Sequence, residues 1–306
     1  MPALMDRAAF FTLIDRRYKA IAEEEYASTL DQIGDWFDVQ TSDAFEERRG
    51  AIGELPIWSP FTGTVDYARM YEQYNSVATH IEFTQGLRWE RTLIDDDLTG
   101  IMRGDRYRKM VRSGIITRQQ HAAQLWNLAT SSAQQFYTRS EGVPIASDSH
   151  TTRTPGVSTA SGFDNLILEE LAPTSYRAAR IQMRHFANDQ GHITNLMGNC
   201  LVVPIDQEPR GMEILQSTHS PDNANNAISP EMGTAKLKVS IYWTDINDWA
   251  LTNDQLMKEN CIWFDRIKPE YRQIMDFDTV QLKAMGYGRW SFLVMDWRWL
   301  MFGSVS

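Results

Sequence analysis

The segment from Gly191 to Thr252 holds two strand patterns separated by a helix and a polar loop. The apolar run 200–203 ends at Pro204, which cannot continue a helix or donate to a central ladder, so it predicts a short strand. A helix follows, with Asp206 as its expected cap. Apolar residues then alternate with polar ones over 236–243, as in a strand with one buried face. This order of elements predicts an α+β fold.

Composition narrows the class of protein. A chain of 306 residues, 42% hydrophobic and 23% charged, is long enough for about two globular domains. The net charge of -10 argues against a dedicated nucleic-acid clamp, because such proteins concentrate Lys and Arg. We expect no signal peptide and no membrane span, because no apolar stretch approaches about 18 residues. Cys200 and Cys261 lie among apolar residues and predict buried, reduced thiols in a reducing cytoplasm.

Most of the negative charge lies in residues 1–60, which hold 12 acids and six bases. Apolar residues from Phe10 to Ala22 recur at helical spacing and predict an amphipathic helix, and Trp36 and Phe37 look like apolar anchors. Two interpretations remain open. The segment is either a solvated acidic face or an extended arm laid over a neighbouring subunit.

Residues 61–94 have the pattern of two strands joined across the polar segment 72–76, with Ile81 and Phe83 alternating with polar residues. We therefore predict a long two-stranded ribbon. Such a ribbon is marginal by itself in water, because it has two open edges and little surface to bury. It needs a surface to lie on, either the core of this chain or another copy.

A long helix is predicted from Asp97 to Tyr137, with Gly114 as a candidate joint. Residues 101–118 carry six bases and one acid, a local balance of +5. The three adjacent aspartates at 95–97 suit a helix N-terminus. A metal site there is disfavoured because neighbouring residues point in different directions.

The remaining segments complete the prediction. Residues 138–162 are rich in Ser, Thr, Gly and Pro and predict a loop or flap, and a second helix is expected over 175–188 with Thr174 as its cap. Short strands are expected at 261–264 and 279–285. The tryptophan-rich end of the chain is so apolar that it must be buried in the core or in a subunit contact.

Motifs that carry chemistry are missing. His150, His185 and His192, with Asp148 and Asp189 beside them, are the best candidates for metal ligands, but the separation of seven between the last two histidines matches no zinc pattern. No G-x-S-x-G elbow and no phosphate loop occurs. We therefore expect a protein that is not an enzyme, with no metal and no cofactor.

A series of short motifs follows a fixed order along the second half of the chain. They are LVVP (201–204), MEILQST (212–218), NNAIS (225–229), WTD (243–245), DWAL (248–251), YGRW (287–290), DWRW (296–299) and FGS (302–304). Together they resemble the Mu-like phage major head subunit family, a branch of the Hong Kong 97-type capsid fold. The resemblance covers residues 52–306.

The resemblance implies a division of the chain. Residues 1–60 would be an N-terminal arm, and 61–94 the extended loop that overlies an adjacent subunit. Residues 95–199 would form a peripheral domain with a long spine helix and a flap. Residues 200–285 would form an axial domain around the five-fold and six-fold axes, and 286–306 a C-terminal strand returning to the peripheral domain.

Two departures from the family limit what carries over. Family members often have Phe-Asp-x-x-His-Pro in the flap, whereas His150 is followed here by Thr151, which leaves any special role of His150 in doubt. The archetype of the fold joins its subunits through a lysine on the extended loop. This chain has no lysine between Lys19 and Lys109, so we expect a shell without that isopeptide cross-link.

The expected function is that of a major capsid protein of a tailed double-stranded DNA phage. It would assemble in the host cytoplasm as pentamers and hexamers into an icosahedral head. Expected partners are further copies of the chain, a portal, scaffolding or decoration proteins, and weak contact with packaged DNA. Candidates for inter-subunit contacts are Trp36, Phe37, Tyr67, Tyr71, Tyr74, Ile81, Phe83, Trp89, Arg106, Arg112, Asn225 and Asn226.

Two alternatives remain open at this stage. One is another virion subunit, such as a tail tube or connector, and the other is a metal-dependent hydrolase using His150, His185 and His192. The basic segment 101–118 either faces DNA or pairs with a neighbour's acidic arm, and we favour the pairing.

Overall fold

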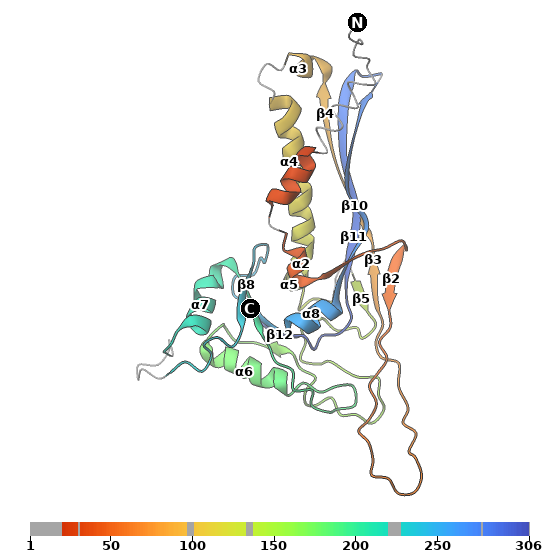
Figure 1. Cartoon of the computed structure of the whole chain (residues 1–306), viewed down its shortest axis with the longest axis vertical. Helices are drawn as coiled ribbons and strands as arrows, with labels where there is room; N and C mark the ends of the chain where they lie inside the picture. Colours follow the sequence, from red (N-terminus) through yellow and green to blue (C-terminus); the bar gives the residue numbers. More distant parts are fainter. Residues whose placement is uncertain are drawn as a thin grey trace.

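The computed structural model describes residues 20–29, 31–96, 101–132, 137–219, 228–276 and 278–305. A tall upper part, in which one long helix runs beside long strands, stands on a lower part with two shorter helices and a smaller sheet (Figure 1). A loop projects below both. Helices and strands mix throughout, which confirms the predicted α+β class.

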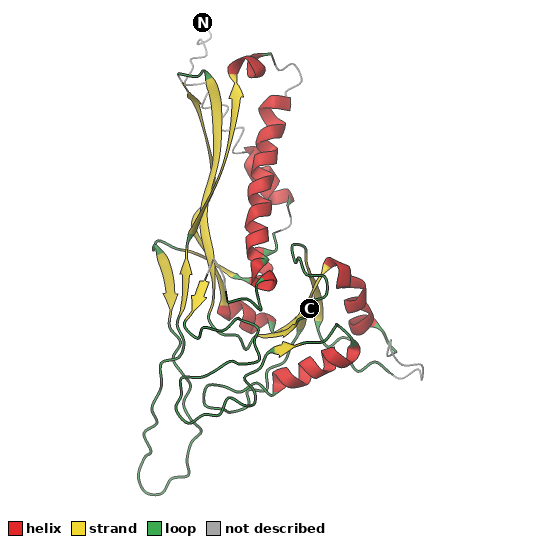
Figure 2. Cartoon of the chain, turned by 180° about the vertical axis from the view of Figure 1, so that it is seen from behind, coloured by secondary structure: helices red, strands yellow, loops and turns green. Residues whose placement is uncertain are grey.

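A four-stranded sheet forms the upper part. Its order is β1 (Asp38–Thr41), β10 (Cys261–Asp276), β11 (Gln281–Val294) and β4 (Ile81–Glu90), with β1 parallel to β10 and the other pairs antiparallel. The long helix α4 (Ile101–Ala122) lies along one face of this sheet, with the short helix α3 (Arg91–Asp95) before it and α5 (Gln124–Asn127) after it (Figure 2).

The lower part contains a five-stranded sheet. Its order is β6 (Leu166–Ile167), β12 (Leu300–Gly303), β9 (Trp249–Thr252), β7 (Cys200–Pro204) and β8 (Lys236–Ser240). Helices α6 (Pro173–Arg184) and α7 (Glu208–Gln216) share one buried apolar cluster with these strands.

The predicted strand, helix and strand are therefore confirmed as β7, α7 and β8. The predicted cap is wrong: a 3-10 turn, η1 (Ile205–Gln207), precedes α7, and Gln207 occupies the cap position without a side-chain bond. Thr174 is likewise not a cap, since α6 begins one residue earlier at Pro173, whose fixed φ and missing N–H suit a first helical position.

A small third sheet joins β2 (Glu46–Arg49), β3 (Ser76–Thr79) and β5 (Tyr137–Arg139). Two short helices pack nearby, α2 (Ile33–Trp36) and α8 (Asp254–Asn260). Asn253 caps α8, because its side-chain oxygen accepts from the backbone N–H of Leu256 at 3.0 Å.

The largest apolar core lies where the upper and lower parts meet. Trp126 of α5 stacks on Trp243 at 5.4 Å between ring centroids and meets Trp36 edge-on at 5.3 Å and Trp299 at 6.1 Å. All four indoles are buried. The prediction that the tryptophan-rich end of the chain is buried is confirmed: Trp290 and Trp299 lie in this core, and Trp297 lies in the cluster around α6.

Gln32 closes the open edge of β8. Its amide nitrogen donates to the carbonyl of Val239 at 2.8 Å, and its amide oxygen accepts from the N–H of Ile241 at 3.2 Å. A neighbouring strand would donate to and accept from the backbone of β8 in the same way. The Gln32 side chain therefore takes the place of a strand at this point of an edge that is otherwise open to association.

The predicted ribbon over 61–94 is wrong in its first half. No strand forms between β2 and β3 apart from a single bridge between Ile52 and Glu72, and the segment is an open loop. Pro56 and Pro60 precede the segment that we assigned to a strand, and proline cannot donate to a ladder. The second half does form a strand, β4, but it pairs with β11.

The predicted helix from Asp97 to Tyr137 is too long. Among the described residues, α4 runs through Gly114 without a joint and ends at Ala122, and the separate turn α5 ends at Asn127. Conversely, β10 and β11 extend well beyond the strands predicted at 261–264 and 279–285. Register shifts between Asp265 and Glu270 interrupt the period of β10, and Gly286 and Gly288 occupy buried positions of β11, so neither extension shows a simple apolar alternation.

Cys200 and Cys261 are both buried and unpaired, as predicted. Burial raises the pKa of the Cys200 thiol to about 12 and that of Cys261 well above its ordinary value. Both therefore stay neutral and unreactive. Across the described ranges, no helix is both long and apolar enough to cross a bilayer.

The pH dependence of stability follows from His121 on α4, whose ring lies 4.3 Å from that of Phe83. Burial lowers the pKa of His121 from 6.5 to about 4. Between these values the unfolded chain takes up a proton that the folded chain resists. The free energy of unfolding should therefore fall as pH decreases from 6.5 towards 4. Chemical unfolding of the subunit at several pH values would measure this, and His121→Phe should flatten the dependence.

His185→Phe is the matched control, because His185 is exposed. It should leave the pH dependence as in the wild type. Equal slopes for His121→Phe and the wild type would contradict the assignment.

Candidate assembly surfaces

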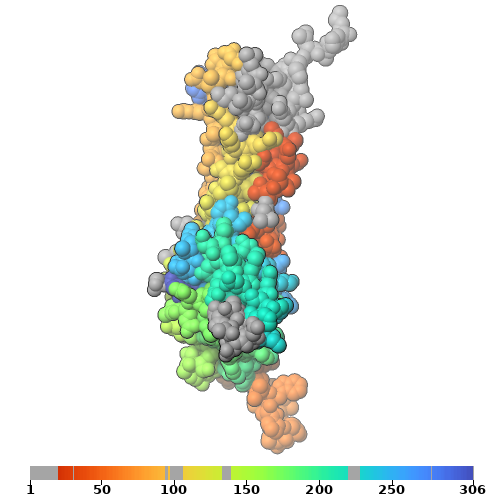
Figure 3. All heavy atoms as spheres, turned by 90° about the vertical axis from the view of Figure 1, so that its left-hand side faces the viewer, coloured from red at the N-terminus to blue at the C-terminus, as the bar shows by residue number. Residues whose placement is uncertain are grey.

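A loop of residues 50–75 stands clear of the body of the molecule (Figure 3). Its large apolar side chains face solvent: Trp58 is 97% exposed and Tyr67 87%. The other exposed apolar residues of the loop are Ile52, Leu55, Ile57, Phe61, Val65 and Met70. A contiguous apolar surface of this kind marks a contact site with another molecule. We call this segment the extended loop.

Among these residues, sequence analysis named only Tyr67 as a contact. Four of the others, Ile52, Leu55, Ile57 and Trp58, lie before the predicted ribbon, and Phe61, Val65 and Met70 lie within it, where a strand was expected. The available signal was the stretch LPIWSPF at 55–61, in which two prolines flank apolar residues that cannot pair in a central ladder. Of the predicted contact residues, Tyr67 lies on the loop and is exposed, whereas Tyr71 and Tyr74 lie at its base and are half-buried.

Several other predicted contact residues lie inside the subunit. Trp36 and Phe37 belong to the large core, and Trp89 lies beneath α4. Ile81 and Phe83 pack against the large core. Their side chains are already covered within one chain, so only the exposed candidates are carried forward. Asn225 and Asn226 lie outside the described residues.

The basic helix α4 pairs with acids of its own chain. Residues 20–28 form a helix beside it, and Glu25 lies 3.1 Å from Nε of Arg108 and 3.0 Å from Nη2 of Arg112. Arg108 also reaches Glu24 at 3.0 Å. The predicted pairing of basic helix and acidic arm therefore occurs, but the arm belongs to the same subunit. The pairing of this helix with a neighbour's arm stays a prediction.

The two ends of this pairing differ in burial. The Glu25 side chain is 6% exposed, whereas that of Arg112 is 58% exposed. Further along α4, Arg118 forms an ion pair with Asp265 of β10 at 2.7 Å, with both side chains buried. Arg106 points to solvent. Three arginines of the helix therefore form ion pairs with acids of the same chain.

The three candidate histidines do not meet. His150 is buried, stacks on Trp297 at 4.3 Å and bonds to Glu141 at 3.2 Å, while His185 is exposed and His192 half-buried. In the ranges that the structure describes, no group of three or more His, Cys, Asp or Glu side chains is placed to hold a metal ion. The three histidines on which the hydrolase alternative relied are therefore not brought together.

The contacts of His150 stabilise the fold around Glu141 and the end of the chain. Burial alone would raise the pKa of Glu141, but the hydrogen bond with His150 and the charge of Arg139 outweigh it and hold that pKa below its ordinary value. The same balance holds at Asp296. Burial alone would raise its pKa, but the charges of Arg298 and Arg139 outweigh this effect and lower the pKa. These groups form a buried ionic cluster that ties the flap to the end of the chain.

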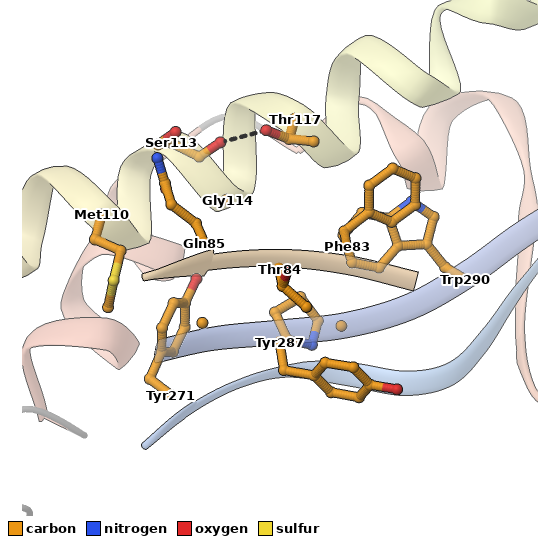
Figure 4. A pocket seen from close by; sticks show the side chains of 13 residues that line it. Phe83, Thr84, Gln85, Met110, Ser113, Gly114, Thr117, Tyr271, Tyr287 and Trp290 are labelled. Atoms are coloured by element: carbon orange, nitrogen blue, oxygen red, sulfur yellow. Dashed lines mark hydrogen bonds between the residues drawn. The ribbon is translucent and has the colours of Figure 1, made fainter. Parts of the chain in front are cut away.

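A cavity of about 200 Å³ lies between α4 and the sheet (Figure 4). Its wall is rich in glycine, and a Cβ atom at Gly114 would come within 2.9 Å of the Tyr271 hydroxyl. Burial raises the pKa of Tyr271. The lining holds aromatic rings, hydroxyls and one amide, without a charged group. The hydroxyls of the lining therefore have no charged acid or base beside them within the cavity wall.

Charge reversal on α4 tests the pairing with residues 20–28. Arg112→Glu places a carboxylate against the buried Glu25, so it should lower the free energy of unfolding by about 1 to 3 kcal/mol and release the N-terminal helix. Thermal unfolding and limited proteolysis of the N-terminal segment would measure both effects.

Arg106→Glu is the matched control on the same helix, because Arg106 is exposed. It should leave stability and proteolysis unchanged. Equal behaviour of the two variants would mean that the ion pairs with Glu25 do not hold the N-terminal helix.

Comparison with known proteins gives one family match. Residues 165–242 match the family described as Mu-like prophage major head subunit gpT. The matched segment runs from just before β6 to just after β8, so it covers most of the lower part. No curated protein matches the sequence.

Solved structures of phage capsids are similar over most of the chain. The capsid of bacteriophage JBD30 has a TM-score of 0.56 at 14% identity, covering 71% of this chain and 92% of that one. A structure from Microbacterium phage Oxtober96 has a TM-score of 0.54 at 11% identity and covers 99% of both chains. A virus-like particle from Pyrococcus furiosus has a TM-score of 0.52 at 5% identity, covering 94% and 98%.

At these identities the structural likeness establishes the fold, and the family match covers residues 165–242 alone. The resemblance noticed in the sequence is therefore confirmed. The chain has the Hong Kong 97-type capsid fold, and its residues 165–242 match the Mu-like prophage major head subunit gpT family.

Proposed function

We propose that this protein is the major capsid protein of a tailed double-stranded DNA phage and builds the icosahedral head from pentamers and hexamers. The observation that carries the proposal is the extended loop of a chain with the capsid fold. Its apolar side chains have no core of their own to enter, so a second copy of the chain has to cover them. The protein acts as a structural component of the virion and catalyses no reaction.

Ring-like assemblies require contacts between different surfaces of identical subunits. The extended loop supplies one such surface, and the neighbour on which it lies supplies the other. An interface of this type buries about 1,200 to 2,000 Å² in total, which eight exposed apolar side chains and their backbone can provide in part. The two large cores stay fixed, while the outer part of the loop, beyond its hydrogen-bonded base, adapts to pentamers and hexamers.

The division into domains that we propose differs in several places from the expectation based on sequence. Strands β10 and β11 lie beside α4, so we place 261–294 in the peripheral domain with that helix. The five-stranded sheet with α6 and α7 then forms the axial domain. We keep residues 20–49 as the arm and move the extended loop to 50–75.

Other partners follow from charge and from the relatives. The net charge of -10 and the pairing of α4 within the chain leave weak affinity for packaged DNA. The JBD30 capsid is decorated with minor capsid protein trimers, and a decoration protein is a reasonable partner here, as are a portal and a scaffolding protein. No observation favours the tail-tube or connector alternative.

The loop contact predicts a separation of folding from assembly. Trp58→Ala should leave the unfolding temperature of the subunit unchanged, because the indole is 97% exposed. It should reduce shell yield at least tenfold, since a buried indole contributes about 3 kcal/mol or more at each copy of the contact. Electron microscopy of the purified protein, expressed with its scaffold if one is needed, would show this.

Ser59→Ala, on the adjacent loop residue, is the control and should assemble normally. Wild-type protein that forms only monomers or helical tubes would refute the capsid proposal. Normal shells from Trp58→Ala would leave the capsid proposal intact but remove Trp58 from the contact.

Mature particles should contain no covalent multimers. The extended loop has no lysine, since none occurs between Lys19 and Lys109, so an isopeptide bond cannot form from it. Denaturing electrophoresis of purified particles should give a single band at 35.2 kDa. A ladder of multimers that survives reduction would overturn this expectation.

A further inference from the structure

Both limbs of the extended loop meet at one buried carboxylate. The first limb is residues 51–54, and the second is residues 71–75. Gly53 donates its N–H to the carbonyl of Tyr71 at 2.8 Å, and Gln73 donates its N–H to that of Ala51 at 2.8 Å. Beyond these bonds the limbs separate. We call residues 51–54 and 71–75 the neck of the loop. The direction of the loop depends on the contacts of this neck.

Asp189 holds the first limb. Its two carboxylate oxygens accept from the backbone N–H of Glu54 at 3.1 and 3.0 Å, and the residue is 8% exposed. Flanking residues add to the grip, since Gln190 donates its amide to the carbonyl of Glu54 at 2.8 Å and Asn188 donates to the Glu54 carboxylate. Three consecutive residues thus hold one residue of the loop.

The same carboxylate also reaches the second limb. The amide nitrogen of Gln73 lies 3.3 Å from Asp189 Oδ2 and 3.0 Å from the hydroxyl of Thr154. The amide oxygen of Gln73 accepts from the backbone N–H of Arg153 at 3.1 Å. Every polar atom of this side chain is engaged, so both limbs are fixed to the flap and to residue 189 together.

The backbone at Gly53 is shaped to the carboxylate. A Cβ atom there would overlap Asp189 Oδ2 and would come within 3.0 Å of both the Gln73 amide and the Tyr71 carbonyl. Any side chain at this position would push the carboxylate off the limb. Glycine is required here for close approach, and its φ is not in the left-handed region.

Asp189 itself sits in a tight hairpin directly after α6. Asn188 accepts through its side chain from the N–H groups of Gln190 at 3.0 Å and His192 at 2.8 Å, and Gly191 has a φ of +80°. A bridge between Ala187 and Ile193 closes the turn. The hairpin is therefore rigid and moves with α6.

We propose that Asp189 is the positioning residue that fixes the direction of the extended loop relative to α6 and the five-stranded sheet. The inference rests on the proposed function: a loop held at one angle reaches one place on a neighbouring subunit. Because α6 and the five-stranded sheet have a fixed place in the subunit, the neck holds the base of the loop at a fixed angle to the body. Loss of the carboxylate frees the loop from that direction without exposing any core residue.

The sharpest variant is Asp189→Asn. It keeps the shape of the side chain but puts an N–H₂ group among donors, so at least one of the bonds to Glu54 and Gln73 is lost. Asp148→Asn is the matched control, because Asp148 lies in the flap, is exposed, and loses the same charge. Neither change touches an apolar core.

Loop direction can be measured on the isolated subunit by distances between two spin labels. One label is attached through Ser59→Cys in the loop and the other through Thr174→Cys on α6, since both residues are exposed. The native thiols of Cys200 and Cys261 are buried and escape labelling. We expect a narrow distance distribution for the wild type and for Asp148→Asn, and one at least twice as broad for Asp189→Asn.

Assembly is measured in parallel by electron microscopy of the unlabelled full chain. Asp189→Asn should unfold within a few degrees of the wild type yet give few or misshapen shells, while Asp148→Asn gives normal ones. If the wild type forms no shell but Asp189→Asn still broadens the distances, the capsid proposal fails and the role of Asp189 stands. Equal distance distributions for the two variants would overturn the role of Asp189.

Gly53→Ala provides a second route in case Asp189→Asn fails to fold. It disturbs the same contact from the side of the loop and should broaden the distances in the same way. Gly34→Ala is its control, because a Cβ at Gly34 meets nothing within 4 Å. A narrow distribution for Gly53→Ala would also count against the proposal.

Discussion

The structure depends on the aromatic core that joins its two parts. Trp36, Trp126, Trp243 and Trp299 come from four distant segments of the chain and bury their rings against one another. Each such ring removes roughly 150 to 250 Å² from water, worth about 4 to 6 kcal/mol before entropy is counted. With this core in place, the tall sheet with α4 and the lower sheet with α6 and α7 have fixed positions relative to each other.

The extended loop makes the single subunit incomplete, because the apolar cores do not cover it. The extended loop lies beyond every apolar cluster, and hydrogen bonds at its neck determine where it points while its apolar side chains stay in water. Hydrogen bonds are directional, so they suit this task better than non-directional apolar packing. A rigid subunit whose extended loop points in one direction and exposes apolar side chains gains stability when copies of it associate.

The charged groups also separate into those paired inside the subunit and those left on its surface. The arginines of α4 are engaged with Glu24, Glu25 and Asp265 of the same chain, and the ionic cluster around Arg139 is buried. These pairs hold the arm and the flap to the body. The surface left for partners is acidic overall and presents apolar groups at the loop, which favours association with other copies of the chain over binding of DNA.

The sequence by itself determined the elements that local rules govern: the strand ending at Pro204, the helix and the alternating strand after it, the buried thiols and the buried tryptophans. The order of short motifs also indicated the family. The sequence did not determine the extents of β10 and β11, whose register shifts and buried glycines interrupt the apolar period, or that β4 pairs with β11.

Only the tertiary structure showed that Trp36 and Phe37 lie in the core, that the acidic partner of Arg112 is Glu25 of the same chain, and that Asp189 meets both limbs of the loop. The contacts of Arg112 with Glu25 and of Asp189 with Glu54 join residues 87 and 135 positions apart. No local pattern encodes such pairs, because they exist only once the core has brought their segments together.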